Sequence, residues 1–266
     1  MCSPRVPGAC WEPRSMPRHP FRAAGRFLNF LWFSALALID FGRTVRPAER
    51  RLGRRNYRLR AEWSHRHAKG LCRVLDLRVE SVGPVPAAQF FCSNHLGYLD
   101  IVTLVAVTPM VFVSKAEVRG WPIIGWLTQC AGTLYLQRER KGDLVEVARQ
   151  FAPILEDNVP VVMFLEGTSS GGDTVLPFRP SLLAPAVGNG WVVAPVALDY
   201  SVSEGTVADD VAYWRDMTFF PHFLNLLGKA WIGGRVAFGT ARPPGADRKI
   251  LAQELHGTVV GLRQKT

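Results

Sequence analysis

The residues best suited to acid–base chemistry are His95 and Asp100, which lie five positions apart in the string NHLGYLD. This string follows a strand-like apolar run and opens a helix-like one, so we expect it at a strand end, where polar groups can face a cleft. Asp100 can fold back across the glycine-containing turn and accept a hydrogen bond from the imidazole. Such a contact fixes the tautomer and favours the imidazolium that forms when His95 takes a proton. Taken alone, this spacing is more often that of a histidine at a strand end and an aspartate that caps a helix.

A second string, VVMFLEGTSSGG, carries an apolar strand into Glu166 and then into a loop of Gly, Ser and Thr that includes Gly167, Thr168 and Ser169. Such a loop exposes N–H groups and hydroxyls that can surround an anion or a polyol, although a plain surface turn has the same composition. Between the two strings, GTLYLQRER predicts a strand that ends in arginines, the first being Arg138.

A fourth string, VVAPVAL, is an apolar strand whose internal Pro195 suits a sheet edge or a bulge. Short β-rich runs and helix-like stretches alternate after residue 74, which predicts an α/β fold with a mixed, largely buried sheet flanked by helices. The expected strands are residues 77–82, 89–93, 110–114, 133–136, 161–165, 192–198 and 235–238. The expected helices are residues 98–107, 123–130, 143–157, 181–187 and 246–262.

The positive charge of the chain is concentrated near its N-terminus. The 266 residues carry a net charge of +10, are 48% apolar and 20% charged, and contain no run of about 18 apolar residues. This composition excludes wholesale disorder and a multi-pass membrane protein. Up to Arg73 there are 16 basic and 4 acidic residues, a net of +12, whereas the remainder has a net of −2.

An apolar run at residues 27–41, FLNFLWFSALALIDF, precedes the arginine-rich stretch at residues 43–73. As a helix the run is about 22 Å long, short of a bilayer core of about 30 Å. We therefore expect an apolar and a basic helix that bind an anionic membrane surface. A nucleic-acid-binding arm, a secretory signal and an ordinary amphipathic helix pair are the alternatives, and no helix-turn-helix or zinc module supports the first. The expected organisation is a disordered leader (residues 1–26), membrane-associating helices (27–73) and a catalytic domain (74–266).

The five cysteines are odd in number, widely spaced and without a C-x-x-C pair. They predict neither a disulfide framework nor a zinc site, and they favour a cytosolic protein.

Taken together and in order, the four strings resemble the glycerolipid acyltransferase family typified by 1-acylglycerol-3-phosphate (lysophosphatidate) acyltransferases. The shared pattern is N-H-x-x-x-x-D, a strand ending in arginine, F-x-E-G-T and V-x-P-V-A, and it extends over residues 77–238. Lys115 and Glu117 stand where that family often has a K-x-E-like pair.

The resemblance implies acyl transfer from a thioester, acyl-CoA or acyl-carrier protein, to a lysolipid hydroxyl, with no other cofactor and no metal. His95 would be the general base and Asp100 its support, with direct attack and no acyl-enzyme. The substrate-binding residues it implies are Lys115, Arg138, Glu166, Gly167, Thr168, Ser169 and Arg179. The strand with Pro195 would support the acyl side, and the enzyme would lie at the cytoplasmic face of a membrane.

The chain departs from the family string F-P-E-G-T-R-S at two positions, where Leu165 replaces the proline and Ser169 the arginine. The family arginine is associated with the acceptor phosphate, a charged and often two-pronged contact that serine cannot make. The first expectation for the acceptor is 1-acyl-sn-glycerol-3-phosphate, giving phosphatidate for phospholipid biosynthesis, with Arg138, Arg140 or Arg179 taking over the phosphate. The alternative is an aminolipid such as lyso-ornithine lipid.

Two other classes of function compete. The string GTSSG has the G-x-S-x-G form of a hydrolase elbow, with Ser169 as nucleophile and Asp199 and His222 or His256 completing a triad. An elbow needs an immediate helix, whereas the residues after Ser169 read as a loop, which disfavours this interpretation. The third hypothesis is a basic, membrane-peripheral binding module without activity.

Overall fold

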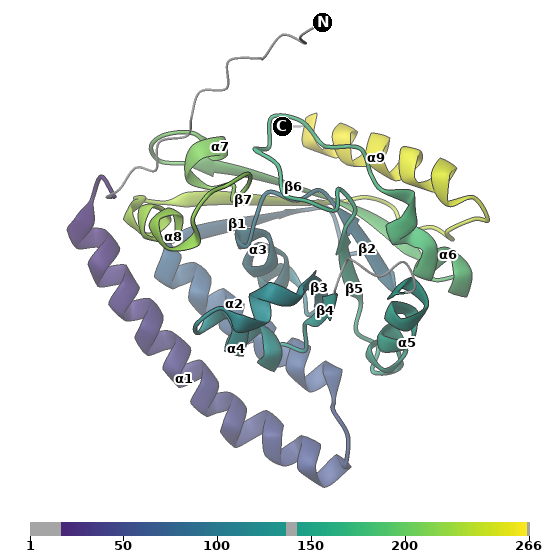
Figure 1. The fold of residues 1–266 in the computed structure, drawn as a ribbon, viewed down its shortest axis with the longest axis horizontal. Coiled ribbons are helices and arrows are strands. Elements are labelled where there is room, and N and C mark those ends of the chain that lie inside the picture. The colour runs from purple at the N-terminus through teal and green to yellow at the C-terminus, as the bar shows by residue number, and fades with distance from the viewer. Residues whose placement is uncertain (1–16, 137–142, 265–266) are drawn as a thin grey trace, which may run out of the picture.

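The structure, a computed structural model, describes residues 17–136 and 143–264. In these residues seven strands form one sheet in the order β1–β7–β6–β2–β5–β3–β4 (Figure 1). All neighbouring strands run parallel except β6 and β7, which are antiparallel, so the expected mixed sheet is confirmed. The strands are β1 (Leu77–Val82), β2 (Phe90–Ser93), β3 (Val111–Lys115), β4 (Leu134–Leu136), β5 (Val161–Phe164), β6 (Val193–Val202) and β7 (Ile232–Phe238).

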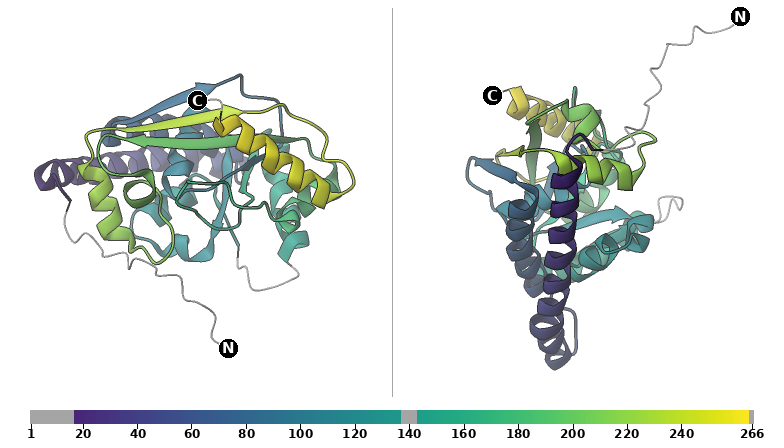
Figure 2. Two further views of the ribbon diagram at one scale, coloured as in Figure 1. Left: turned by 90° about the horizontal axis from the view of Figure 1, so that it is seen from above. Right: turned by 90° about the vertical axis from the view of Figure 1, so that its left-hand side faces the viewer.

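Helices cover both faces of the sheet (Figures 1 and 2). Side chains alternate between the faces along each strand, so in β2 Phe91 joins one core and Phe90 and Cys92 join the other. The Phe91 core is closed by α1 (Pro20–Leu52), α2 (Tyr57–Leu75), α3 (Leu99–Val107) and α8 (Phe219–Gly228). The opposite core is closed mainly by α5 (Asp143–Glu156), α6 (Ala184–Asn189) and α9 (Arg248–Gln264). Every side chain of β2 and β5 is buried, as expected for central parallel strands covered on two sides.

Two short α-helices and two 3-10 helices, Ala116–Gly120 and Pro180–Leu183, complete the described fold. Helix α4 (Ile124–Cys130) lies between β3 and β4, and α7 (Val207–Asp210) follows β6. The sequence-based expectations did not include α7 or α8.

The N-terminal helices differ from the expected boundaries. Helix α1 begins at Pro20 and runs for 33 residues to Leu52, so residues 20–26 are helical rather than part of a disordered leader. It is about 50 Å long, and by length and composition it could cross a membrane, which the 15-residue apolar run alone could not. Gly53 ends it in the left-handed conformation, and the Asn56 side chain caps α2 by accepting a hydrogen bond from the Leu59 N–H.

Pro195 lies inside the sheet, so the expected edge position is wrong. Its strand, β6, is paired with both β2 and β7. The β7 side is irregular at this point, because Val196 pairs with Phe238 whereas Val193 pairs with Arg242, which leaves one extra residue on the β7 side. The missing N–H of proline is therefore tolerated at a bulge-like step, the other alternative expected from the sequence.

The sheet order brings the chemical strings together. Strand β2, which precedes His95, is hydrogen-bonded to β5 on one side and to β6 on the other. The carboxyl ends of these parallel strands lie at one edge of the sheet, so the loops that carry His95 and Glu166 are neighbours. Ser170 N–H donates to the His95 carbonyl (2.9 Å) and joins the two loops directly.

Candidate active site

His95 and Asp100 form a hydrogen-bonded pair in the turn between β2 and α3. The His95 Nδ1–H donates to Asp100 Oδ2 across 2.7 Å, and the same oxygen accepts from the N–H groups of Leu96 (2.7 Å) and Gly97 (3.0 Å). Asp100 is fully buried at the start of α3, whereas His95 remains partly exposed. Since Nδ1 carries the proton toward the carboxylate, Nε2 is left with a lone pair. The geometry is that of a base held by a buried carboxylate.

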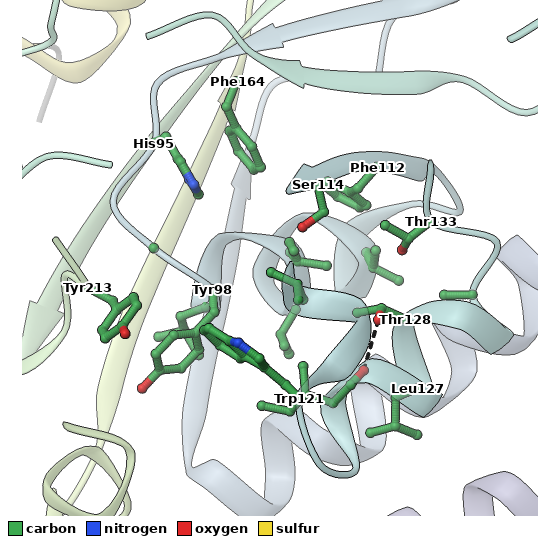
Figure 3. Close-up of a pocket in the computed structure, with 18 of the residues that line it drawn as sticks. His95, Tyr98, Phe112, Ser114, Trp121, Leu127, Thr128, Thr133, Phe164 and Tyr213 are labelled. Carbon is green, nitrogen blue, oxygen red and sulfur yellow. Dashed lines mark hydrogen bonds between the residues drawn. The ribbon is translucent and has the colours of Figure 1, made fainter. Parts of the chain in front are cut away.

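Further contacts fix the imidazole of His95 and the turn that carries it. Its ring stacks on Phe164 at the end of β5, with centroids 4.0 Å apart and planes 14° from parallel. The preceding Asn94 ties the turn to β6, because its amide donates to the Leu198 carbonyl (3.0 Å) and accepts from the Leu198 N–H (2.8 Å). As Figure 3 shows, the ring nitrogen points away from the turn, past Phe164 and into a cavity.

A residue that sequence reasoning missed, Tyr200, completes the surroundings of Asp100. Its hydroxyl donates to Asp100 Oδ1 (2.9 Å) and is 3.0 Å from the hydroxyl of Thr103, which itself donates to the Leu99 carbonyl (3.0 Å). Burial, and then the negative charge of Asp100, raise the pKa of the Tyr200 hydroxyl well above its ordinary value, which keeps it a donor. The alternation of β6 could have indicated it, since Tyr200 lies two residues beyond Leu198 on the same face of the strand.

Glu166 is buried beneath the Gly/Ser/Thr loop. Its Oε1 accepts from the Leu176 N–H (3.1 Å), while Oε2 has no hydrogen-bond partner among the described residues. Burial raises the pKa of the Glu166 carboxyl to about 8, since the nearby N–H groups offset only part of the desolvation. At neutral pH this carboxyl is therefore mostly protonated and can donate a hydrogen bond.

Gly167, Thr168 and Ser169 line the same cavity as His95, whereas Glu166 is not among the residues that line it. Thr168 is exposed, Ser169 is half-buried, and the exposed Arg179 crosses Gly167 so closely that a Cβ there would lie 2.7 Å from Arg179 Nε. The close approach and the positive φ of Gly167 (69°) both require glycine at this position.

Two of the residues implied by the resemblance cannot be placed in the site. Arg138 lies outside the described residues. Lys115 is the last residue of β3, and its side chain is also outside the described part of the chain.

The cavity has a volume of about 860 Å³ and is lined mainly by apolar side chains. Its mouth is marked by exposed polar residues, namely Glu117, Thr168, Arg179, Arg215 and Asp216. From His95 it continues between α3, α4 and the inner faces of α1 and α2, where the lining side chains are buried; they include Phe30, Ala37, Trp63 and Ala68. Figure 3 shows Phe112, Trp121 and Leu127 along this course. The shape suits a ligand with a polar head and a long apolar tail.

The elements of a serine hydrolase are not brought together. No helix follows Ser169 directly; the chain continues without regular structure to the short turn at Pro180–Leu183. Asp199 accepts from Arg263 (2.7 Å), and His256 contacts the Val175 carbonyl (3.1 Å). His222 is buried against the Tyr98 hydroxyl (2.8 Å), and burial lowers its pKa to about 4. The partners of these three residues are thus other than Ser169.

The described residues contain no group of three or more His, Cys, Asp or Glu side chains that could hold a metal ion.

Comparisons with known proteins point to a single family. The family described as "Acyltransferase" matches residues 78–199. The lyso-ornithine lipid O-acyltransferase of Rhodobacter capsulatus is 34% identical over 80% of this chain and 81% of its own length. The 1-acyl-sn-glycerol-3-phosphate acyltransferase of Neisseria gonorrhoeae is 33% identical over 50% of this chain and 53% of its own.

Among solved structures, the 1-acyl-sn-glycerophosphate acyltransferase PlsC of Thermotoga maritima has a similar fold. The TM-score is 0.60 and the identity 20%, over 92% of this chain and 99% of that one.

Proposed function

The chain belongs to the acyltransferase family, and on that premise we propose that it transfers a fatty acyl group from a thioester to the free hydroxyl of a lysolipid. The observation that carries this proposal is the position of His95. Its Nε2 points into a cavity with a polar mouth and an apolar interior, while its Nδ1 is held on buried Asp100.

In the proposed reaction, the lysolipid hydroxyl binds with its proton toward His95 Nε2. His95 removes that proton as the oxygen attacks the thioester carbonyl carbon, and Asp100 stabilises the imidazolium that results. The tetrahedral intermediate then collapses, the C–S bond breaks, and the leaving thiolate takes the proton from His95. The products are the diacyl lipid and the free thiol of the carrier, so the base is regenerated without an acyl-enzyme.

The buried part of the cavity is proposed to hold an acyl chain. Its walls come from α1, α2, α3 and α4 and are mostly apolar, so desolvation of a hydrocarbon tail favours binding. The donor is an acyl-CoA or an acyl-carrier protein, and no step of the proposed reaction uses a metal or another cofactor.

For the acceptor, 1-acyl-sn-glycerol-3-phosphate is one candidate. The Neisseria and Thermotoga proteins are named for it, and Arg179 lies at the cavity mouth, where a phosphate could bind. A phosphatidate-forming enzyme would act in phospholipid biosynthesis.

A second candidate acceptor is an aminolipid such as lyso-ornithine lipid. The specific observation in its favour is Ser169, which stands where the F-P-E-G-T-R pattern has arginine and lines the cavity beside Thr168. The Rhodobacter relative is named for this acceptor.

The enzyme is proposed to work on an anionic membrane, at the cytoplasmic face where thioester donors occur. Helix α1 turns an apolar side to the outside: the exposed side chains are Phe21, Leu28, Trp32, Leu36 and Ile39. Exposed arginines follow at the end of α1 and in the loop after it, including Arg50, Arg51, Arg54 and Arg55. This combination is typical of helices that lie in the interface of anionic lipid.

Acyl transfer by the purified full-length protein tests the proposal directly. Labelled acyl-CoA, and separately labelled acyl-carrier protein, are supplied with lysophosphatidate or lyso-ornithine lipid in mixed micelles. We expect a labelled diacyl product with one acceptor and none with the His95→Ala variant. Release of free fatty acid without transfer to either lysolipid would contradict the proposal.

A further inference from the structure

Arg215 lies at the mouth of the cavity, on the loop between α7 and α8, and the sequence motifs do not include it. Its guanidinium is stacked on the indole of Trp214, 3.8 Å from the ring centroid. Stacking fixes the plane of a guanidinium and leaves its N–H edge free to bind an anion. In the described residues neither Arg215 nor Arg179 forms an ion pair with a carboxylate.

Trp214 itself is held over the Gly/Ser/Thr loop. Its indole N–H donates to the Ala208 carbonyl (2.9 Å), and its ring covers Gly171 so closely that a Cβ there would lie 2.6 Å from the ring. Because Gly171 is two residues from Ser169, the indole connects Arg215 to the loop that lacks the family arginine, and Arg215 and Ser169 line the same cavity.

The loop between α7 and α8, which carries Trp214 and Arg215, is also fixed relative to His95. Tyr213 N–H donates to the Leu96 carbonyl (2.8 Å) in the turn that follows His95. At the start of this loop, the buried carboxylate of Asp210 accepts hydrogen bonds from Lys229 Nζ (2.5 Å) and from the Asn225 amide (2.8 Å). These contacts hold the backbone around Arg215 in a fixed position relative to His95, whose Nε2 takes the proton.

We propose that Arg215 binds the anionic group of the acceptor head group and supplies the cation that Ser169 cannot. This inference rests on the proposed lysolipid acyltransfer and names a specificity-determining residue for it. The anion is a phosphate in lysophosphatidate or an α-carboxylate in lyso-ornithine lipid, and an arginine fork fits either.

The neighbouring Asp216 distinguishes the two sources of the anion. It is exposed and lines the same mouth, and its carboxylate forms no ion pair in the described residues. An ornithine head group whose α-nitrogen is acylated still carries a side-chain ammonium that this carboxylate can bind, whereas a phosphomonoester carries none.

Three variants test the proposal, with KM and kcat measured for each substrate. Arg215→Gln should raise the KM for the acceptor by about 10- to 100-fold, the range for loss of hydrogen bonds to a charged group. The KM for the donor should not change. Gly171→Ala should act in the same direction, because the added methyl group displaces the indole that supports Arg215. Asp216→Asn should raise the KM for lyso-ornithine lipid but not for lysophosphatidate.

Arg78→Gln is the matched control, since Arg78 is also placed over an indole, that of Trp231 at 5.4 Å, but does not line the cavity. It should leave both KM values unchanged. If the wild type is active and Arg215→Gln leaves the KM for the acceptor unchanged, this inference alone is overturned. A wild type that acylates neither lysolipid would overturn the proposed function instead. In that case titration calorimetry with each lysolipid still decides on Arg215, whose replacement must weaken binding.

Discussion

Tyr200 donates a hydrogen bond to Asp100 on the oxygen opposite the one that holds His95, so the base and the tyrosine are joined through one buried carboxylate. Four donors in total surround that carboxylate, two of them backbone N–H groups. A fully buried carboxylate is stable in its charged form only with such a complement of donors. The dyad therefore depends on a residue about a hundred positions away in the sequence.

The first prediction concerns the base. His95→Ala should lower kcat by about 10²- to 10⁴-fold, the usual contribution of a positioned general base. Thermal unfolding of the variant checks that it is folded. A folded His95→Ala protein with wild-type turnover would exclude His95 as the base.

The second prediction concerns Tyr200. Tyr200→Phe removes one hydrogen bond to Asp100 and should lower kcat by about 3- to 30-fold while leaving both KM values unchanged, because the residue touches no substrate. Tyr57→Phe, at a buried tyrosine outside the cavity lining, serves as the control. An effect confined to KM, or equal loss in both variants, would argue against this role.

The third prediction follows from the pKa of Glu166. The folded state raises this pKa from 4.5 to about 8, so between these values the unfolded chain has lost the proton and the folded one keeps it. The contribution of Glu166 to the free energy of unfolding should therefore fall as pH rises, by about 1.4 kcal/mol per unit. Below about pH 6.5 it is opposed by His222, whose pKa burial lowers from 6.5 to about 4, so the net fall should be seen between about pH 6.5 and 8. Urea unfolding of Glu166→Gln at several pH values should show a flatter dependence, whereas Glu80→Gln at an exposed site should keep the wild-type slope.

The fourth prediction concerns the depth of the cavity. Ala131 lines its apolar part, so Ala131→Phe should shorten the space for a tail and shift the preferred donor to shorter acyl chains. Rates measured on a series of saturated acyl-CoA thioesters give this preference. Ala246→Phe adds the same volume at an exposed site outside the cavity and should leave the preference as it is. An unchanged preference in Ala131→Phe would place the tail elsewhere.

The fifth prediction concerns the membrane surface. Deleting α1 and α2 would remove core side chains such as Phe30 and Leu75, so substitutions on the outer face are more informative than truncation. The double variant Trp32→Glu, Leu36→Glu should bind anionic vesicles at least tenfold more weakly, since each buried side chain contributes about 1.5–3 kcal/mol. In a sedimentation assay, Val82→Glu, Val85→Glu changes two exposed apolar residues away from α1 and should bind as wild type does.

Sequence patterns predicted those features that interactions within a short segment of the chain determine. The turn from His95 to Asp100, the buried strands β2 and β5 and the loop after Glu166 lie where composition and spacing placed them, because a short segment determines each. For Pro195 the sequence left open a sheet edge or a bulge, because both make the same demand on a proline, and only the neighbouring strand separates them. Tyr200 and Arg215 were missed because their contacts, with Asp100 and across Gly171, arise only when distant segments pack.

Helix α1 is both an inner wall of the catalytic cavity and the outer apolar surface of the molecule. We therefore expect the enzyme to meet its lysolipid within the plane of the bilayer, so that the relevant concentration is the mole fraction of lysolipid in the bilayer and not its amount per litre. Adding inert phospholipid at constant total lysolipid should slow turnover by surface dilution. The turnover of an enzyme that takes its lipid from water would not change when inert phospholipid is added.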